Sequence, residues 1–325
     1  MPMSLTSRRT LRFGGYGALL LALATLPLIT SNPFYLRLGT EVLIFGLLAM
    51  SLDVLLGYTG LLSFMHAGYM GIAAYSVGLF LIHFDPTASI WLLFLVGTAA
   101  AALVALPVGW LQVRTGGFAF ALLTIAFGMM FYTVVWRARD LTGGDDGLIG
   151  IPRPSIGIGG WVLGSTKDPG PMFLLALFVV AVCYALTKRI MDSPFGAVLA
   201  AIRENEERAV FIGFNVRNYK LGGWMLACSL AGVAGTLSAL QNGFVTPTMM
   251  DPTAGGSVLM MTILGGLGTL WGPFVGAAAF LALQEYTTQA TEHWMIFMGL
   301  IIILLVLFMP KGIAGLVRRG PRNRE

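Results

Sequence analysis

The stretch ASIWLLFLVGTAAAALVALPVGWLQ, residues 88–112, contains no aspartate, glutamate, lysine or arginine. A helix rises about 1.5 Å per residue, and the hydrocarbon core of a membrane is about 30 Å thick. The stretch is therefore long enough to cross a membrane as one helix. A helix that is apolar on every side needs either a large protein core or lipid around it.

The composition of the whole chain indicates that lipid, and not a large protein core, surrounds this helix. Of its residues 57% are hydrophobic and only 11% are charged, whereas soluble domains carry about 25% charged residues. We predict an all-α integral membrane protein with one transmembrane domain over residues 1–325 and about ten transmembrane helices. The ten apolar stretches are 14–30, 38–56, 64–84, 88–112, 117–136, 171–190, 219–241, 255–270, 273–290 and 294–309. The first resembles a signal peptide, but many spans follow it, so we expect a retained helix.

Lysine and arginine are distributed unevenly between the loops. Ten spans place both termini and the segment 192–218 on one side of the membrane, and the loop 137–170 on the other. Fifteen of the twenty Lys and Arg residues then lie on the side of the termini. The positive-inside rule makes that side cytoplasmic. Because these residues are scattered between apolar runs, the net charge of +5 does not indicate a nucleic-acid partner.

Two parts of the chain resemble each other. Residues 49–52 followed by 60–63 are similar to residues 227–230 followed by 235–238. These motifs lie on the second and seventh spans, which run in opposite directions, and this is the arrangement of an inverted 5+5 repeat. Most glycines in such spans allow close packing of helices, and a minority is expected to mark broken helices beside a solute path. Chance similarity between glycine-rich helices is the alternative.

The segment 192–218 is both long and charged, unlike the other loops. Ser193 is a good N-cap and Pro194 suits the first helical position, so a short amphipathic helix is predicted. Its polar side carries Glu204, Glu206 and Glu207. A helix lying on the membrane surface is the alternative, but such helices favour lysine and arginine. We therefore predict a cytoplasmic segment that docks a protein.

The loop 137–170 is rich in turn-forming residues. Its acidic residues Asp140, Asp145 and Asp146 do not have the spacing of an EF-hand calcium loop. We expect a solvated external loop that docks an external partner.

Ionisable groups inside a span are costly and are therefore candidates for solute contact. The candidates for the solute pathway are Asp53, Ser63, His66, Gln284 and Glu285. Helix capping or an internal hydrogen bond explains Asp53 and His66 equally well. No second carboxylate or histidine follows at helical spacing, which disfavours a proton relay and an ion-coupled carrier.

The chain has no sequence signature of an enzyme. It contains no Gly-x-x-x-x-Gly-Lys-Ser/Thr motif for ATP, so an ATPase that drives it has to be a separate polypeptide. Cys183 and Cys228 lie in apolar runs without metal-ligand spacing. We expect a transport subunit without a cofactor or metal.

Several motifs resemble one family. Residues 207–213 are similar to the Glu-Ala-Ala, three residues, Gly motif by which importer permeases engage their ATPases, with Arg208 in place of the middle alanine. The chain resembles the LivM-like permeases of branched-chain amino acid importers over residues 40–315. Further motifs that carry the resemblance are 57–64 with His66, 141–144 with 150–152, and 265–268 with 272–273. The resemblance implies that the residues coupling transport to the ATPases are Arg203, Glu204, Glu207, Arg208, Ala209 and Gly213.

The same resemblance implies the partners, the location and a solute class. The expected partners are a second permease subunit, two cytoplasmic ATPase subunits and a periplasmic solute-binding protein, in a bacterial inner membrane. Branched-chain amino acids are the expected solute. Met65 stands where relatives often carry glycine and Asp53 where many carry asparagine, so urea, short amides and other small organic solutes remain alternatives.

Overall fold

The computed structural model describes residues 32–158, 161–290, 296–300 and 312–317, together with the isolated positions 25, 27, 303 and 307. The spans predicted at 14–30 and 294–309 lie largely outside these residues. Within the described part, the chain is predominantly helical.

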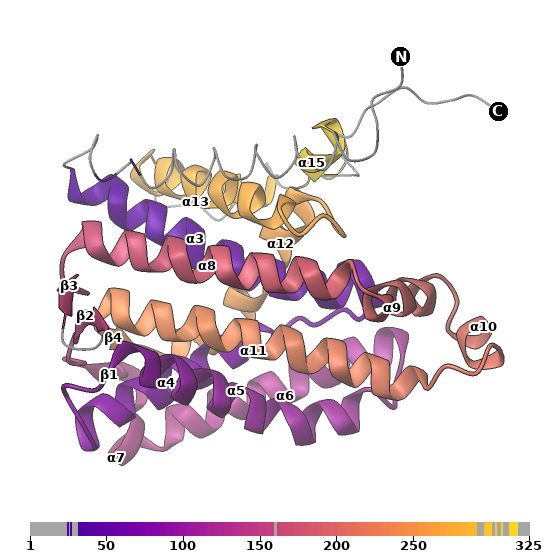
Figure 1. Cartoon of the computed structure of the whole chain (residues 1–325), viewed down its shortest axis with the longest axis horizontal. Coiled ribbons are helices and arrows are strands. Elements are labelled where there is room, and N and C mark those ends of the chain that lie inside the picture. The colour runs from indigo at the N-terminus through magenta and orange to yellow at the C-terminus, as the bar shows by residue number, and fades with distance from the viewer. Residues whose placement is uncertain are drawn as a thin grey trace.

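Five helices in the described residues are long and apolar enough to cross a membrane. They lie side by side in Figure 1. Their bounds are Pro33–Thr59, which comprises α3 (Pro33–Asp53) and the π-helical turn η1 (Val54–Thr59), then α5 (Ile90–Gln112), α6 (Gly117–Arg137), α8 (Pro169–Met191) and α11 (Val216–Asn242). The chain is therefore a multi-pass helical membrane protein, as the composition predicts.

Two shorter apolar helices follow two of the long ones after a stretch that is not α-helical. Residues 60–66 connect η1 to α4 (Ala67–His83), and residues 243–251 connect α11 to α12 (Pro252–Gly265). Within the second connection lie β4 (Phe244–Val245) and the short 3₁₀ helix η3 (Pro247–Met250). Irregular backbone at membrane depth is tolerated only where protein or a cavity surrounds it. Both connections pack against neighbouring helices of the bundle.

Helix α11 lies at the centre of the packing and contacts α3, α4 and α5. Trp224 on α11 is buried, and its indole Nε1 donates to the Ala105 carbonyl of α5 at 3.0 Å. Gly109, one turn further along α5, lies so close to the Trp224 ring that a methyl group there would fall 2.5 Å from Nε1. Small residues thus bring these helices together, as expected where lipid removes the hydrophobic driving force.

The short elements at one end of the bundle lie mostly in the predicted loop 137–170. They are α7 (Arg139–Thr142), η2 (Gly144–Asp146), β1 (Leu148–Ile149), β2 (Ser155–Ile158) and β3 (Trp161–Ser165). Strand β1 pairs antiparallel with β4, and β2 pairs antiparallel with β3. The turn-forming composition of this loop gave no indication of the strands. We call this end of the bundle the strand end.

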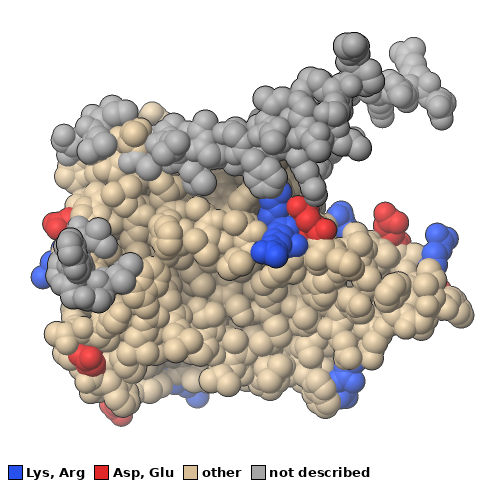
Figure 2. Space-filling model, in the orientation of Figure 1, with Lys and Arg blue, Asp and Glu red and all other residues tan. Residues whose placement is uncertain are grey.

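Helices α9 (Pro194–Glu204) and α10 (Glu206–Phe211) lie at the opposite end, where α10 projects beyond the long helices (Figure 1). We call this the α9 end. The turn 266–271 joins α12 to α13 (Gly272–Ala290), and α15 (Gly312–Val317) packs against both helices. On the face in Figure 2, charged side chains gather toward the two ends of the helices, and a broad uncharged surface separates them.

Candidate functional site

The segment 192–218 forms the two short helices α9 and α10. Helix α9 buries Val198, Leu199 and Ile202, which is the helical spacing seen in the sequence. Ala209 of α10 is buried against Val198, Ile202 and Val216. Ala209 is only 3% exposed there, so the alanine of the motif belongs to the small apolar contact between these helices.

Two further contacts fix the shape of this segment. Gly213 follows the end of α10 with a φ of 97°, a backbone conformation that residues other than glycine rarely adopt. The Nζ of the buried Lys220 lies 2.6 Å from Glu206 Oε2, which ties α10 to the start of α11. Glu206 is therefore engaged in an ion pair, although its side chain is 51% exposed and the sequence groups it with Glu204 and Glu207.

The outer surface of α10 is free to meet a partner. Glu204, Glu207 and Arg208 are all exposed. Beside them, Phe211 is 88% exposed and Ile212 is 69% exposed. Sequence reasoning missed these apolar residues. The available signal was a run of apolar residues directly after an acidic patch in a loop outside the membrane.

Arg203 points the other way, into the bundle. Its Nη1 donates a hydrogen bond to the carbonyl oxygen of Gly57 in η1. A π-helical turn leaves backbone groups out of the regular α-helical pattern, and such turns are frequent at functional sites. Helix α9 therefore directly contacts η1, the turn that continues α3.

Asp53 lies one turn before Gly57 and is fully buried. Its carboxylate accepts backbone hydrogen bonds from Gly268 at 2.6 Å, Thr269 at 3.2 Å and Leu270 at 3.1 Å. Leu270 has a φ of 55°, which is uncommon for a residue other than glycine, so the carboxylate holds the turn 266–271 in a strained form.

Arg203, Gly57, Asp53 and the backbone of 268–270 thus form one connected cluster, which we call the Asp53 latch. It joins α9 to the end of α3 and to the turn between α12 and α13. Gly57 has to be glycine here, because a methyl group would fall 2.6 Å from the Gly268 nitrogen. Of the two predicted roles for Asp53, the internal hydrogen bond is the one that the structure displays.

His66 is also buried and engaged. Its Nε2 lies 2.9 Å from the Oγ of Ser51 on α3. The Ser51 hydroxyl also lies 2.6 Å from the Leu48 carbonyl oxygen, to which it donates. His66 therefore ties the start of α4 to α3.

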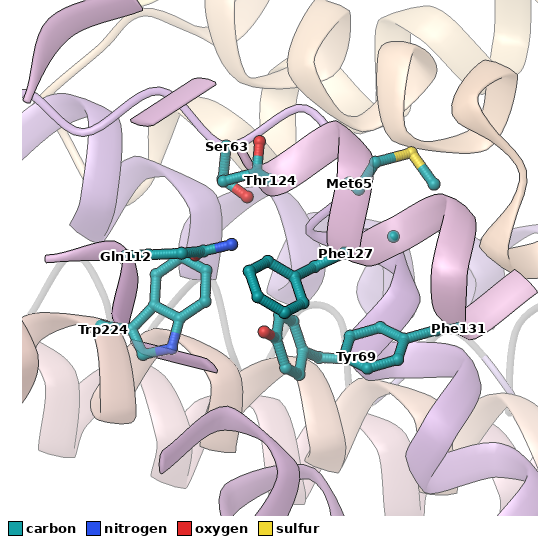
Figure 3. A pocket seen from close by; sticks show the side chains of 9 residues that line it. Ser63, Met65, Tyr69, Gln112, Thr124, Phe127, Phe131 and Trp224 are labelled. Carbon is teal, nitrogen blue, oxygen red and sulfur yellow. The ribbon is translucent and has the colours of Figure 1, made fainter. Parts of the chain in front are cut away.

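A small pocket lies between the segment 60–66 and the helices α4, α5, α6 and α11 (Figure 3). Its walls lie so close together that no water molecule fits between them. We call it the Ser63 pocket, and its lining residues are Ser63, Met65, Tyr69, Gln112, Thr124, Phe127, Gly128, Phe131 and Trp224. Tyr69 and Trp224 meet edge to face with ring centroids 5.5 Å apart. Four of the nine lining residues are thus aromatic, and none carries a charge.

The polar groups of this pocket differ in their hydrogen bonds. The Thr124 hydroxyl donates to the Ala121 carbonyl at 2.7 Å and accepts from the Phe64 N–H at 3.1 Å. Gln112 is 0% exposed and Ser63 is 1% exposed. Neither the amide group of Gln112 nor the hydroxyl of Ser63 has a hydrogen-bond partner among the described residues. Sequence reasoning named Ser63 but missed Gln112, which ends an apolar span and looks like an ordinary polar helix end.

Gln284 and Glu285 lie elsewhere, on α13. Glu285 Oε1 accepts from Gln289 Nε2 at 2.8 Å, one turn along the same helix, and it lies close enough to Glu41 to repel that carboxylate. Neither residue lines the Ser63 pocket. The five predicted pathway residues therefore fall into separate places, and only Ser63 faces the pocket. The described residues contain no cluster of three or more potential metal ligands among His, Cys, Asp and Glu.

Comparison with known proteins gives one consistent family. Residues 34–306 match the family described as the permease component of branched-chain amino acid transport systems. The chain is 27% identical over 322 residues to the high-affinity branched-chain amino acid transport system permease protein LivM of Escherichia coli K12, covering 92% of this chain and 75% of the relative. It is 25% identical over 291 residues to LivH of the same strain, covering 83% of this chain and 91% of the relative. No solved structure matches significantly.

Proposed function

The chain belongs to the family of permease components of branched-chain amino acid transport systems, and on that premise we propose that it carries branched-chain amino acids across the inner membrane as a subunit of an ATP-driven importer. Relatives in this family are membrane permeases and not catalysts. Separate ATPase subunits supply the energy through the segment 192–218. The observation that carries this proposal is the exposed tip of α10, which projects from the bundle with apolar and charged groups together.

The composition of that tip supports docking to a protein. Phe211 and Ile212 supply apolar area that desolvates on contact, and aromatic side chains are enriched at the centres of protein interfaces. Glu204, Glu207 and Arg208 form a charged rim that fixes orientation. Arg203 then links the docked segment to η1. A push on α10 therefore reaches the transmembrane helices through defined contacts.

A charge reversal tests the dock. In the reconstituted importer with its ATPases and binding protein, Glu204→Lys with Glu207→Lys should lower solute uptake at least tenfold, because two rim charges become repulsive, while the subunit still inserts and purifies normally. Uptake and ATP hydrolysis are measured together in proteoliposomes. Glu204→Gln with Glu207→Gln is the control, because it keeps the size of both exposed side chains and reverses no charge, so uptake should fall less. Normal uptake in the charge-reversed variant would overturn the docking assignment.

The solute is tested on the wild-type complex. ATP hydrolysis is measured with binding protein and, in turn, leucine, isoleucine, valine, urea and acetamide. Stimulation by the three amino acids is expected. Stimulation by urea or acetamide alone would replace the proposed solute.

The α9 end is the cytoplasmic end in this proposal, which places both termini inside. Basic residues at that end include Arg114 and Arg217, whose guanidinium carbons lie 3.7 and 4.9 Å from the centre of the Trp110 ring. Tryptophan and basic side chains together are typical of a membrane interface, and their excess marks the cytoplasmic side.

We also propose ten transmembrane helices in an inverted 5+5 repeat within one domain, residues 1–325. The support is a matched pair of arrangements. Helix Pro33–Thr59 has 27 residues and leads through 60–66 into the short helix Ala67–His83, and helix Val216–Asn242 has 27 residues and leads through 243–251 into the short helix Pro252–Gly265. Broken segments of this kind mark the solute path in inverted-repeat transporters.

The partners follow from the same reading. LivM and LivH are separate permease proteins of the same named system, so a second permease subunit is the expected neighbour in the membrane. Two ATPase subunits at the α9 end and a periplasmic solute-binding protein at the strand end complete the proposed importer. The loop 137–170, with its short strands, is the surface available to the binding protein.

A further inference from the structure

The Ser63 pocket contains polar atoms that the folded chain leaves without partners. Both functional atoms of the Gln112 amide, Nε2 and Oε1, are buried and unpartnered, and so is the Ser63 hydroxyl oxygen. Burying such groups without hydrogen bonds is unfavourable, and each case in a native protein calls for an explanation. In Figure 3, Gln112 extends over Trp224 toward Phe127, and Ser63 lies beside Thr124 on another side of the same space. The two groups come from different elements and face one pocket.

We propose that Ser63 and Gln112 bind the polar head of the transported solute, and that the aromatic wall of the pocket receives an aliphatic side chain. This inference rests on the proposed import of branched-chain amino acids and names the site in this subunit where the solute makes contact.

The chemistry of the two side chains fits an amino acid. The Gln112 amide offers two N–H donors and an acceptor oxygen, and the Ser63 hydroxyl both donates and accepts. A carboxylate accepts from Nε2 and from the hydroxyl, and an ammonium group donates to Oε1. Because neutral partners on both sides suit a zwitterion, a net-neutral solute enters without leaving an unpaired charge in the low-dielectric interior.

The remaining walls select for an apolar tail. Met65, Phe127 and Phe131 line the space together with the edge-to-face pair of Tyr69 and Trp224. Urea would satisfy the polar groups but would leave this aromatic surface unused. None of the lining residues is charged, so nothing there compensates the net charge of a cationic or dicarboxylic amino acid.

The volume indicates a closed state of the site. The space between the walls has no room for a water molecule, whereas typical ligand pockets hold roughly 300–1,000 Å³. The site is therefore a constriction that the solute opens as it passes, and its polar groups wait unpaired between transport events.

The test uses the complete importer reconstituted with its ATPases and binding protein, supplied with saturating L-leucine. Gln112→Leu and Ser63→Ala should each lower leucine uptake per ATP hydrolysed at least tenfold, as expected when a polar substrate group loses its partner in a buried site. Because both substitutions remove an unsatisfied polar group, the thermal unfolding temperature of the purified subunit should stay the same or rise. Thr187→Val is the matched control, since the Thr187 hydroxyl is buried and unpartnered but does not line the pocket.

The outcomes separate the two proposals. Wild-type uptake per ATP in both variants would overturn the site and leave the proposed function standing. A fall in unfolding temperature that matches the loss of uptake would also overturn it, because the side chains would then be structural. If the wild-type importer transports urea or acetamide but does not transport leucine, the proposed function itself is overturned, together with the amino-acid assignment of the pocket.

Discussion

The Asp53 latch and the Ser63 pocket both hold buried polar groups, but one satisfies them and the other does not. At the latch, three backbone N–H groups converge on one carboxylate. In the pocket, the Gln112 amide and the Ser63 hydroxyl have no hydrogen-bond partner among the described residues. Satisfied polar networks make a region rigid, whereas unsatisfied buried groups cost stability and each calls for an explanation. The latch is therefore expected to be rigid, whereas the pocket keeps polar groups that a ligand can bind.

The largest effect is expected at the centre of the latch. Asp53→Leu removes the acceptor of three N–H groups, and each buried donor left unpaired costs about 1–3 kcal/mol. We expect a loss of about 3 kcal/mol or more, measured as a fall in the thermal unfolding temperature and in the yield of monodisperse protein. Asp53→Asn keeps one acceptor oxygen and should lie between wild type and Asp53→Leu. Equal stability of all three proteins would show that the carboxylate does not hold the turn 266–271.

A smaller effect is expected from crowding the latch. Gly57→Ala places a methyl group 2.6 Å from the Gly268 nitrogen, and overpacking of this kind typically costs about 1–3 kcal/mol. The turn 266–271 has to move away, so uptake should fall as well. Gly256→Ala on α12 is the matched control, because a methyl group at Gly256 meets no atom within 4 Å, and it should unfold at the wild-type temperature or slightly above it.

The smallest expected effect is a difference in stability between variants of two hydroxyl groups that line the Ser63 pocket, those of Thr124 and Ser63. Thr124→Val leaves the Phe64 N–H without its acceptor and should destabilise the protein by about 1–2 kcal/mol. Ser63→Ala removes a hydroxyl that has no partner, and its stability should stay within about 0.5 kcal/mol of wild type. Unfolding temperatures of the two purified variants decide the matter. A reversed order would contradict the distinction between bonded and unbonded groups on which the comparison depends.

Much of the architecture could be predicted from the sequence. Long runs without charge locate the membrane helices, because lipid imposes both their length and their composition, and the predicted stretch 88–112 differs from α5 by two residues at its start. The segment 192–218 was predicted as helical from Ser193 and Pro194, and α9 begins at Pro194. The strands β1 and β4 were not predictable, since Leu148 and Val245 pair across 97 positions of sequence.

Site residues were predictable from the sequence only where a single residue is energetically unfavourable in an apolar span, whatever its neighbours. Asp53 stands out in any apolar span, and the structure adds its partners, which lie more than 200 positions away. Gln112 is not costly at the end of a helix exposed to water. Its burial depends on how α5, α6 and α11 come together, and no local pattern contains that information. The inward direction of Arg203 depends in the same way on the position of η1.

The latch also determines which parts of the protein can move separately. Because it fastens α9, the end of α3 and the turn before α13 to one another, these elements would shift as a single body if the proposed ATPases pushed on α10. Helix α6 is fastened much less, since its buried residues are only Phe120, Ala121, Thr124 and Gly128. It supplies one wall of the Ser63 pocket, and α11, which packs against α3, supplies the opposite one. The pocket therefore lies between α11, which packs against the latched α3, and α6, which is held by few buried side chains.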